Sequence, residues 1–362
     1  MKKIVFILSH QPNPRFVKQI DYLSKTNQVT VLYFYRTYMK DLTNEYSVDL
    51  NICLGVIENG KYLSRIIKYF KSFIKLKKIL KKRDYDILII NNIDTLVLFR
   101  LATLKKIKVI IEISDLREHT YTNTIKSHTI RFIEKYLFKK IDKLIVTSPK
   151  FYELYYKNIF NKEVFILENK PLKNMIPKKL EKIKNKKIRI GIVGLLLQGK
   201  PYKTLLDTVK SDNNYEVLIY GRGVYQDLIE EYANQYENIK YYGEYNFFKD
   251  ISRIYANLDI LYMPYDTTNG SLNNKVALPN KFYEALYFYI PIITSKDTYL
   301  GELVEKYQVG VTIECCNKKD LIEALLYMNK HILEFQNNFL KIDKSIYIGD
   351  KDYNLLEDFI CS

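Results

Sequence analysis

Residues 86–115 read DILIINNIDTLVLFRLATLKKIKVIIEISD, and two short apolar runs stand out in this stretch, at 87–90 and 109–113. Both runs are rich in isoleucine, and the second one ends at Ser114 and Asp115. Strands that are apolar throughout are buried on both faces, as in a parallel sheet that helices cover on two sides. The stretch therefore predicts two neighbouring strands of an α/β domain.

The same pattern continues through the chain in both directions. Further strands are expected at 3–8, 29–35, 144–147, 187–193, 215–220, 239–242, 258–263, 291–294 and 311–313, and helices at 16–24, 62–82, 202–210, 224–235, 247–257, 280–288 and from about 320 onward. Polar residues follow the run at 3–8 at once, which favours a first buried strand over a signal peptide. Apolar strands that alternate with helices predict an α/β fold of doubly wound parallel sheets.

Length and composition suit two packed domains. The chain has 362 residues, 47% of them hydrophobic and 27% charged, which excludes a disordered, collagenous or coiled-coil protein. We expect one domain at 1–172, a basic linker at 173–189, a second domain at 190–345 and a C-terminal segment at 346–362 that is free to return to the first domain. The four cysteines show no CxxC spacing, so we expect a reducing compartment and neither disulfides nor a zinc site.

The net charge of +16 is confined to the first half of the chain. Residues 1–172 hold 32 basic and 16 acidic side chains, whereas 173–362 hold 25 of each. The stretch 61–83 predicts a helix with ten Lys or Arg residues and no acidic residue; the plainer alternative is a solvated face above a packed apolar stripe. A basic half attracts a polyanion or an anionic membrane surface. Candidates for an acceptor-binding or membrane-facing surface are Arg15, Arg65, Lys68, Lys71, Lys75 and Lys78.

A series of short motifs in the second half follows an order that one enzyme family shares. The motifs lie at 190–194, 200–206, 217–223, 239–243, 254–264, 278–286, 290–294, 301–304 and 309–310. They resemble the nucleotide-sugar domain of GT-B glycosyltransferases, particularly the family 4 (group 1) type. The first half resembles the acceptor domain of this family more loosely, at Arg15, Lys18, Asp115 and 168–171. The resemblance implies two Rossmann-like domains that face each other across a cleft.

The resemblance also implies a donor site in the second domain. Candidates are Gly194, Lys200, Lys203, Gly221, Arg222, Pro279, Asn280, Lys281 and Glu284. Pro279 and Asn280 open a helix whose N–H groups and dipole suit a diphosphate, and Lys281 adds a positive charge. Glu284 follows one turn later, where the family uses a glutamate for the ribose hydroxyls. The alternative is an N-cap asparagine with a solvated glutamate on a surface helix.

The chain departs from the family pattern at several positions. Val276 stands where the family has the first of two glutamates, near the donor sugar. Lys200 is preferred over Lys203 for the diphosphate, although both stay open. Arg222 is either a further cation of the site or a surface turn residue. The Gly-x-Gly that begins at Gly221 has no third glycine, so we expect no dinucleotide site.

Two candidates for catalysis follow strands of the first half. Asp115 lies where the family often carries a His-Asp pair, with Ser114 at the histidine position. It is expected to orient an acceptor hydroxyl or to stabilise positive charge at the anomeric carbon, unless it only caps the next helix. His10 lies in the loop after the first strand and is equally an incidental loop residue, and His119 is a weaker candidate.

These features predict a glycosyltransferase that moves a sugar from a nucleoside diphosphate sugar to a lipid-linked glycan of a bacterial capsule or O-antigen. The resemblance implies retention at the anomeric carbon. We expect neither metal nor cofactor, because helix dipoles and Lys or Arg side chains stabilise the departing diphosphate. The expected location is cytoplasmic, peripheral on the inner face of the cell membrane, without a nucleic-acid partner. The alternatives are a nucleotide-sugar epimerase, a polyanion-binding protein and a catalytically silent scaffold of the same fold.

Overall fold

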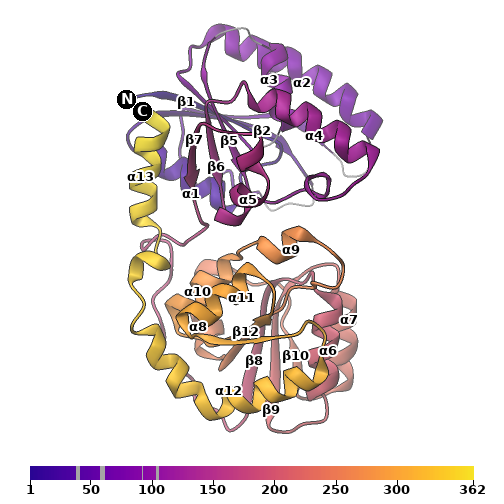
Figure 1. Ribbon diagram of the computed structural model, residues 1–362. Coiled ribbons are helices and arrows are strands. Elements are labelled where there is room, and N and C mark those ends of the chain that lie inside the picture. Colours follow the sequence, from indigo (N-terminus) through magenta and orange to yellow (C-terminus); the bar gives the residue numbers. More distant parts are fainter. Residues whose placement is uncertain (38–40, 58–61, 92, 103–105) are drawn as a thin grey trace. The chain divides into compact units, whose positions relative to one another are not determined.

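The computed structural model describes residues 1–37, 41–57, 62–91, 93–102 and 106–362, without the side chains of 62–70, Asp94 and Leu101. The chain forms two compact units, which Figure 1 shows. Unit 1 comprises Met1–Asn169 together with Lys351–Ser362, and unit 2 comprises Lys170–Asp350. The end of the chain is therefore part of unit 1.

Unit 1 contains a seven-stranded parallel sheet with the order β3-β2-β1-β4-β5-β6-β7. Its strands are β1 (Lys3–Leu8), β2 (Gln28–Tyr35), β3 (Leu50–Val56), β4 (Ile87–Ile90), β5 (Lys108–Ile113), β6 (Lys143–Val146) and β7 (Glu163–Ile166). Its helices are α1 (Pro14–Leu23), α2 (Tyr62–Lys82), α3 (Ile93–Ala102), α4 (Ile125–Phe138), α5 (Pro149–Leu154) and α13 (Asp350–Cys361), with short 3₁₀ turns η1 (Glu118–Thr120) and η2 (Tyr156–Asn158).

The strand order of unit 1 reverses next to β1, which pairs with β2 on one side and with β4 on the other. Because helices cover both faces of the sheet, β1 is buried from Ile4 to Leu8, and this explains its unbroken apolar sequence. The chain then turns into α1, where Pro14 is the first helical residue and the Asn13 side chain accepts a hydrogen bond from the Phe16 N–H. A reversal of this kind leaves a crevice at the carboxyl ends of the strands.

The C-terminal helix α13 packs on unit 1 through Tyr353, Leu356 and Ile360, which are buried. The ring of Tyr353 lies 5.4 Å from that of Tyr22 on α1. The buried amine of Lys143, at the start of β6, donates to the carbonyl oxygen of Phe359 over 2.7 Å. The last helix is thus an integral part of this unit.

Unit 2 contains a six-stranded parallel sheet with the order β10-β9-β8-β11-β12-β13. Its strands are β8 (Ile188–Leu195), β9 (Tyr215–Arg222), β10 (Ile239–Tyr241), β11 (Ile260–Met263), β12 (Ile292–Ser295) and β13 (Gly310–Ile313). Its helices are α6 (Gly199–Val209), α7 (Gln226–Gln235), α8 (Phe247–Ala256), α9 (Leu272–Val276), α10 (Asn280–Phe288), α11 (Tyr299–Tyr307) and α12 (Lys318–Phe339), followed by η3 (Lys344–Ile346).

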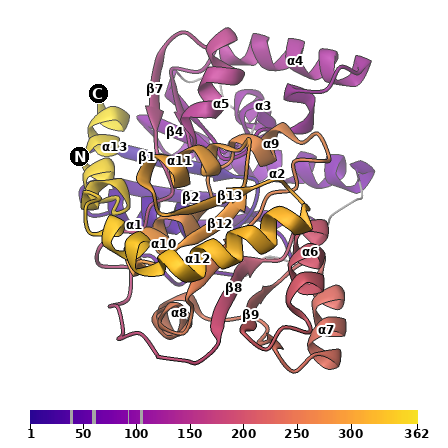
Figure 2. The same cartoon turned by 60° about the horizontal axis from the view of Figure 1, so that its bottom comes forward.

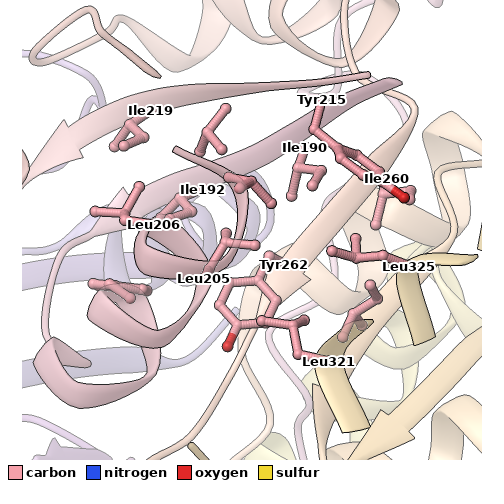
Figure 3. Packing of buried hydrophobic residues seen from close by; sticks show 14 of the residues in the cluster. Ile190, Ile192, Leu205, Leu206, Tyr215, Ile219, Ile260, Tyr262, Leu321 and Leu325 are labelled. Carbon is pink, nitrogen blue, oxygen red and sulfur yellow. The ribbon is translucent and has the colours of Figure 1, made fainter. Parts of the chain in front are cut away.

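Helices cover both faces of this second sheet. On one face, α6, α7 and α12 enclose a core, and α12 runs beside β13 (Figure 2). Figure 3 shows side chains of this core from β8 (Ile190, Ile192), α6 (Leu205, Leu206) and α12 (Leu321, Leu325). On the other face, α8, α10 and α11 form a second core. The predicted α/β architecture with two doubly wound parallel sheets is confirmed.

Candidate active site

Two glycines bring the ends of β8 and β9 together in unit 2. Gly194 and Gly221 are paired across the two strands and have φ angles of +102° and +135°, a region that favours glycine. A Cβ on Gly221 would collide with the carbonyl group of Gly194. A Cβ on Gly194 would collide with Cε and Nζ of Lys281, which comes from α10. Three of the expected donor-binding residues therefore meet at one point.

The N-terminus of α10 lies at the same point. Pro279 is its N-cap residue and makes no side-chain cap hydrogen bond, and Asn280 is its exposed first residue. The backbone N–H groups of a first helical turn carry partial positive charge and bind anions. Burial lowers the pKa of Lys281, and the charge of Glu284 partly opposes this shift. The Lys281 amine and the start of α10 together form a cradle suited to a diphosphate.

Glu284 lies one turn along α10 and is buried, with 7% of its surface exposed. The hydroxyl of Tyr255, from the end of α8, donates a 2.9 Å hydrogen bond to Oε2 of Glu284. Burial and the charge of Glu284 raise the pKa of Tyr255 and also that of Tyr245. The alternative of an N-cap asparagine and a solvated glutamate is therefore wrong, because Pro279 is the cap and Glu284 is enclosed.

The other predicted cations of unit 2 differ in their surroundings. Lys203 donates to Tyr232 over 2.8 Å and to Asp207 over 2.9 Å, and both bonds raise its pKa. These contacts direct Lys203 toward α7, whereas Lys200 is exposed in the first turn of α6. Arg222 follows Gly221 and forms a half-exposed ion pair of 2.9 Å with Glu244. The geometry thus favours Lys200 over Lys203 as the residue that contacts the diphosphate. Arg222 lies at the end of β9.

The loop around Val276 is tied to the same end of the sheet. Val276 is buried in α9, so its side chain is part of the packing. The backbone N–H of Asp266 donates to the side chain of Gln198 over 2.8 Å, and the Asn274 amide donates to the carbonyl of Asp266. The sequence alone indicated no role for Gln198 or Asp266. Tyr255 lies within the motif at 254–264 and likewise had no predicted role. Its contact with Glu284 is visible only in the fold.

Unit 1 holds a pocket of about 400 Å³ at the carboxyl ends of its central strands. His10 after β1, Asn91 after β4 and Asp115 after β5 all line it. Asp115 is exposed there, and the next helical turn is η1, whose N-cap residue is Arg117. Asp115 is thus not the cap of that turn. The two predicted catalytic candidates of unit 1 share one pocket.

His10 is held in a defined orientation. Its Nδ1 lies 2.7 Å from the Gln11 carbonyl oxygen, and its Nε2 lies 3.1 Å from the amide nitrogen of Asn91. These partners favour the tautomer in which Nδ1 donates and Nε2 accepts. Burial lowers the pKa of His10, and the charges of Arg36 and Arg15 add to this effect against the Gln11 hydrogen bond. Burial and the neighbouring cations therefore favour the neutral form of the ring.

The pocket wall also holds a cluster of polar side chains that the sequence did not predict to lie together. Glu134 on α4 is buried and accepts a 2.5 Å hydrogen bond from the Tyr155 hydroxyl. His119 places Nε2 3.2 Å from the same carboxylate oxygen. The sequence alone indicated only His119. The sequence does not show that Glu134 lies on the buried face of α4, or that Tyr155, at the end of α5, contacts it. Both His119 and Glu134 line the pocket.

Arg15 is buried, so the expectation that it belongs to a membrane-facing surface is wrong, whereas its role toward the acceptor stays a prediction. Its Nε lies 2.8 Å from Oε1 of Glu112, and the two side chains are 7% and 0% exposed. Arg15 also contacts Ser114, and Gln19 donates to Oε2 of Glu112 over 2.8 Å. Arg15 is placed inside because α1 packs against the end of β5, where an acidic residue points inward.

Among its described side chains, the basic helix α2 exposes its lysines and buries Leu76 and Leu80. Lys71, Lys75 and Lys78 are exposed, and Lys75 donates to the carbonyl oxygen of Cys53 over 2.6 Å. The side chains of Arg65 and Lys68 lie outside the described residues. Across the parts of the chain that the structure covers, no helix is long and apolar enough to cross a membrane. Within those same parts, no three His, Cys, Asp or Glu side chains cluster as metal ligands would.

Two protein-family models match the chain. The model described as "Glycosyl transferases group 1" matches residues 175–339, and "Glycosyl transferase 4-like" matches residues 3–148. Together they span most of both units.

Characterised relatives and a solved structure are similar over most of the chain. The succinoglycan biosynthesis protein ExoL of Rhizobium meliloti is 22% identical over 75% of this chain and 71% of its own length. The O-antigen biosynthesis glycosyltransferase WbnH of Escherichia coli is 25% identical over 75% of this chain and 80% of its own. HepE of Anabaena, solved with UDP and glucose, shares the fold with a TM-score of 0.69 and 14% identity, over the full length of both chains.

Proposed function

The chain belongs to the group 1 glycosyltransferases, and from this premise we propose that it transfers a sugar from a nucleoside diphosphate sugar to a lipid-linked glycan. The names of its relatives support a role in bacterial surface polysaccharide synthesis, since ExoL and WbnH act in succinoglycan and O-antigen biosynthesis. A cytoplasmic location at the inner face of the membrane fits such an acceptor. Retention of the anomeric configuration is part of the proposal.

One observation carries the assignment of the donor site. Gly194, Gly221 and Lys281 meet at the N-terminus of α10, with the Glu284 carboxylate one turn behind. Because the two glycines carry no Cβ, the ends of β8 and β9 and the Lys281 side chain approach one another closely, and the Lys281 amine and the helix N–H groups supply positive charge. Glu284 is the acceptor of the ribose hydroxyls in this proposal. A nucleoside diphosphate is the ligand that matches this set of groups.

The transfer breaks the bond between C1 of the sugar and the diphosphate oxygen, and it forms a bond from C1 to the acceptor oxygen. The proton of the acceptor hydroxyl passes to the departing diphosphate in the same reaction. Negative charge grows on the departing diphosphate, where Lys281 and the start of α10 stabilise it. In unit 1, the exposed Asp115 orients the acceptor hydroxyl, and His10 lines the same pocket.

Calorimetry with a panel of nucleoside diphosphates, with and without a chelator, tests the donor site. We expect one base to bind with micromolar affinity in both conditions, and UDP is the first to try because HepE was solved with it. Glu284→Gln should weaken that binding by about tenfold, because an amide is a poorer acceptor for two hydroxyls than a carboxylate. Asp207→Asn, in the last turn of α6, is the control. Absence of binding by every nucleotide would contradict the proposal and favour a silent scaffold.

A further inference from the structure

Helix α4 of unit 1 has two faces of opposite character. On one face Ser127, Glu134 and Phe138 are buried against the unit. On the opposite face Ile125 and Phe132 expose 88% and 77% of their surface. Tyr136 exposes 56% and continues the same stripe, because positions i, i+7 and i+11 align on an α-helix. Apolar side chains of this size in one row mark an interaction surface.

Basic residues flank this apolar stripe. Lys126, Lys135, Lys139 and Lys140 are exposed on or directly after α4. The Lys140 amine lies 5.0 Å from the centre of the Tyr136 ring. The acidic residue in the sequence of α4 is Glu134, and it is buried. The exposed face therefore combines apolar side chains with positive charge only.

We propose that α4 docks on an anionic lipid bilayer, with Ile125, Phe132 and Tyr136 entering the boundary between headgroups and acyl chains. Amphipathic helices of this composition lie in the plane of that boundary, and each nearby Lys adds attraction to anionic lipid. Because lysines flank the apolar stripe, an anionic lipid surface fits it better than an uncharged apolar partner. The inference deepens the proposed function and rests on it for the acceptor, since a lipid-linked acceptor resides in such a bilayer.

Helix α4 also connects the docking surface to the pocket of unit 1. Ile130, Ile133, Glu134 and Leu137 line the pocket that also contains Asp115. One helix thus forms both the wall of the proposed acceptor pocket and the surface that touches lipid. The headgroup of an acceptor in the bilayer would then need to travel little to reach Asp115.

Two other helices clarify why α4 is chosen. On α2, Lys71, Lys75 and Lys78 supply charge, whereas Ile74 is the exposed apolar residue among its described side chains. On α12 of unit 2, an exposed apolar stripe is formed by Ile322, Leu326 and Leu333, and the C-cap residue Leu340 continues it. That stripe has the exposed acids Glu323 and Glu334 beside exposed lysines that include Lys330, so its flanks carry charges of both signs and attract anionic lipid less than those of α4. It provides a matched control within the same chain.

Because the chain contains no tryptophan, a single substitution can report on insertion. Phe132→Trp in the full-length protein should give an emission maximum that shifts by about 10 nm to shorter wavelength with vesicles of phosphatidylcholine and about 30% phosphatidylglycerol. Pure phosphatidylcholine should give a much smaller shift, and salt should weaken the response. Leu333→Trp, on α12, should show no shift with either vesicle.

Flotation with the same anionic vesicles measures the contribution of the stripe. Ile125→Ser with Phe132→Ser should lower the bound fraction by at least about tenfold, because two large apolar groups no longer leave water. Leu333→Ser should float like the wild type. Replacing Lys126, Lys135 and Lys139 with Gln should reduce binding and its dependence on salt.

Three results would overturn the proposal. If the Ile125→Ser, Phe132→Ser variant floats as the wild type does, α4 does not bind the membrane. An emission maximum of Phe132→Trp that does not change with vesicles leads to the same conclusion. A shift that grows with protein concentration in the absence of vesicles would assign the stripe to a contact between copies. Nucleotide calorimetry on the same variants separates the two proposals: lost vesicle binding with intact nucleotide binding concerns α4 alone, and the reverse concerns the donor site.

Discussion

The hydroxyl of Tyr255 donates a 2.9 Å hydrogen bond to Oε2 of Glu284, and the Tyr255 ring stacks on Phe288 with 4.7 Å between the centroids. The first contact fixes one carboxylate oxygen, and the second fixes the ring that holds it. Glu284 therefore presents its other oxygen in a defined direction. Tyr255 acts through Glu284 and is a positioning residue of the proposed donor site.

Tyr255→Phe keeps the stacked ring and removes this hydrogen bond. We expect UDP, or whichever nucleoside diphosphate binds, to bind about fivefold more weakly, since a lost bond to a carboxylate is worth about 1 kcal/mol in affinity. The 2′,3′-dideoxy nucleotide offers Glu284 no hydroxyl, so its affinity should not change. Calorimetry with both nucleotides decides the matter, and an equal loss for both would assign the effect to the fold.

Gly194→Ala tests the close approach of Lys281. The added methyl group occupies the place of Cε and Nζ of Lys281, and the φ of +102° adds strain of about 1–3 kcal/mol. We expect nucleoside diphosphate binding to fall by at least about tenfold. Gly243→Ala is the control, since Gly243 also has a positive φ but its Cβ would meet no atom within 4 Å. Equal nucleotide binding by both variants would contradict the assignment.

Binding should depend on pH through Lys281. Burial lowers the pKa of its amine in the free protein, and a bound diphosphate favours the charged form. Between the lowered pKa and the higher pKa of the complex, binding takes up a proton, so the affinity falls as pH rises. Calorimetry between about pH 7 and pH 10 in two buffers counts that proton. Lys281→Met should bind weakly without proton uptake, and a proton released on binding by the wild type would refute the role of Lys281.

The buried pair of Arg15 and Glu112 should matter for stability. Glu112→Gln leaves the Arg15 guanidinium buried without its counter-charge, which we expect to lower the free energy of unfolding by about 3–5 kcal/mol. Glu163→Gln is the matched control on a neighbouring part of the sheet, because Glu163 is 65% exposed where it pairs with Lys143. Its effect should stay below about 1 kcal/mol. Urea unfolding compares the two, and similar midpoints would show that the buried pair contributes nothing.

The sequence predicted the strands that are buried on both faces and missed two at the edges of the first sheet. β1, β4 and β5 are central, so their residues are mostly apolar, with Glu112 as the buried exception in β5. β3 and β7 are the outermost strands, and their side chains are mostly half-exposed or exposed. An edge strand buries one side only, so its sequence carries a weaker pattern. That physical difference explains why β3, which includes an Asn and a Gly, was not expected.

The candidate site could likewise be predicted only in part from the sequence. The helix start at Asn280 and the cation at Lys281 could be named from residue type and spacing, with the family resemblance as a guide. The close approach of Lys281 to Gly194 and the hydrogen bond from Tyr255 to Glu284 join residues that are distant in sequence, and only the packed fold brings them together. The error at Arg15 has the same origin, because a count of charges does not show that Glu112 points inward.

The return of α13 to unit 1 has a consequence for how the protein is made. Unit 2 is a continuous segment, so all of its strands are synthesised before α13. Unit 1 receives Tyr353, Leu356 and Ile360 from α13, which follows the strands of unit 2 in the sequence. Domains generally fold in the order of synthesis, from the N-terminus onward. Here the domain that starts first is the one that is finished last, and until then the surface that α13 covers is exposed to the ribosome and to chaperones.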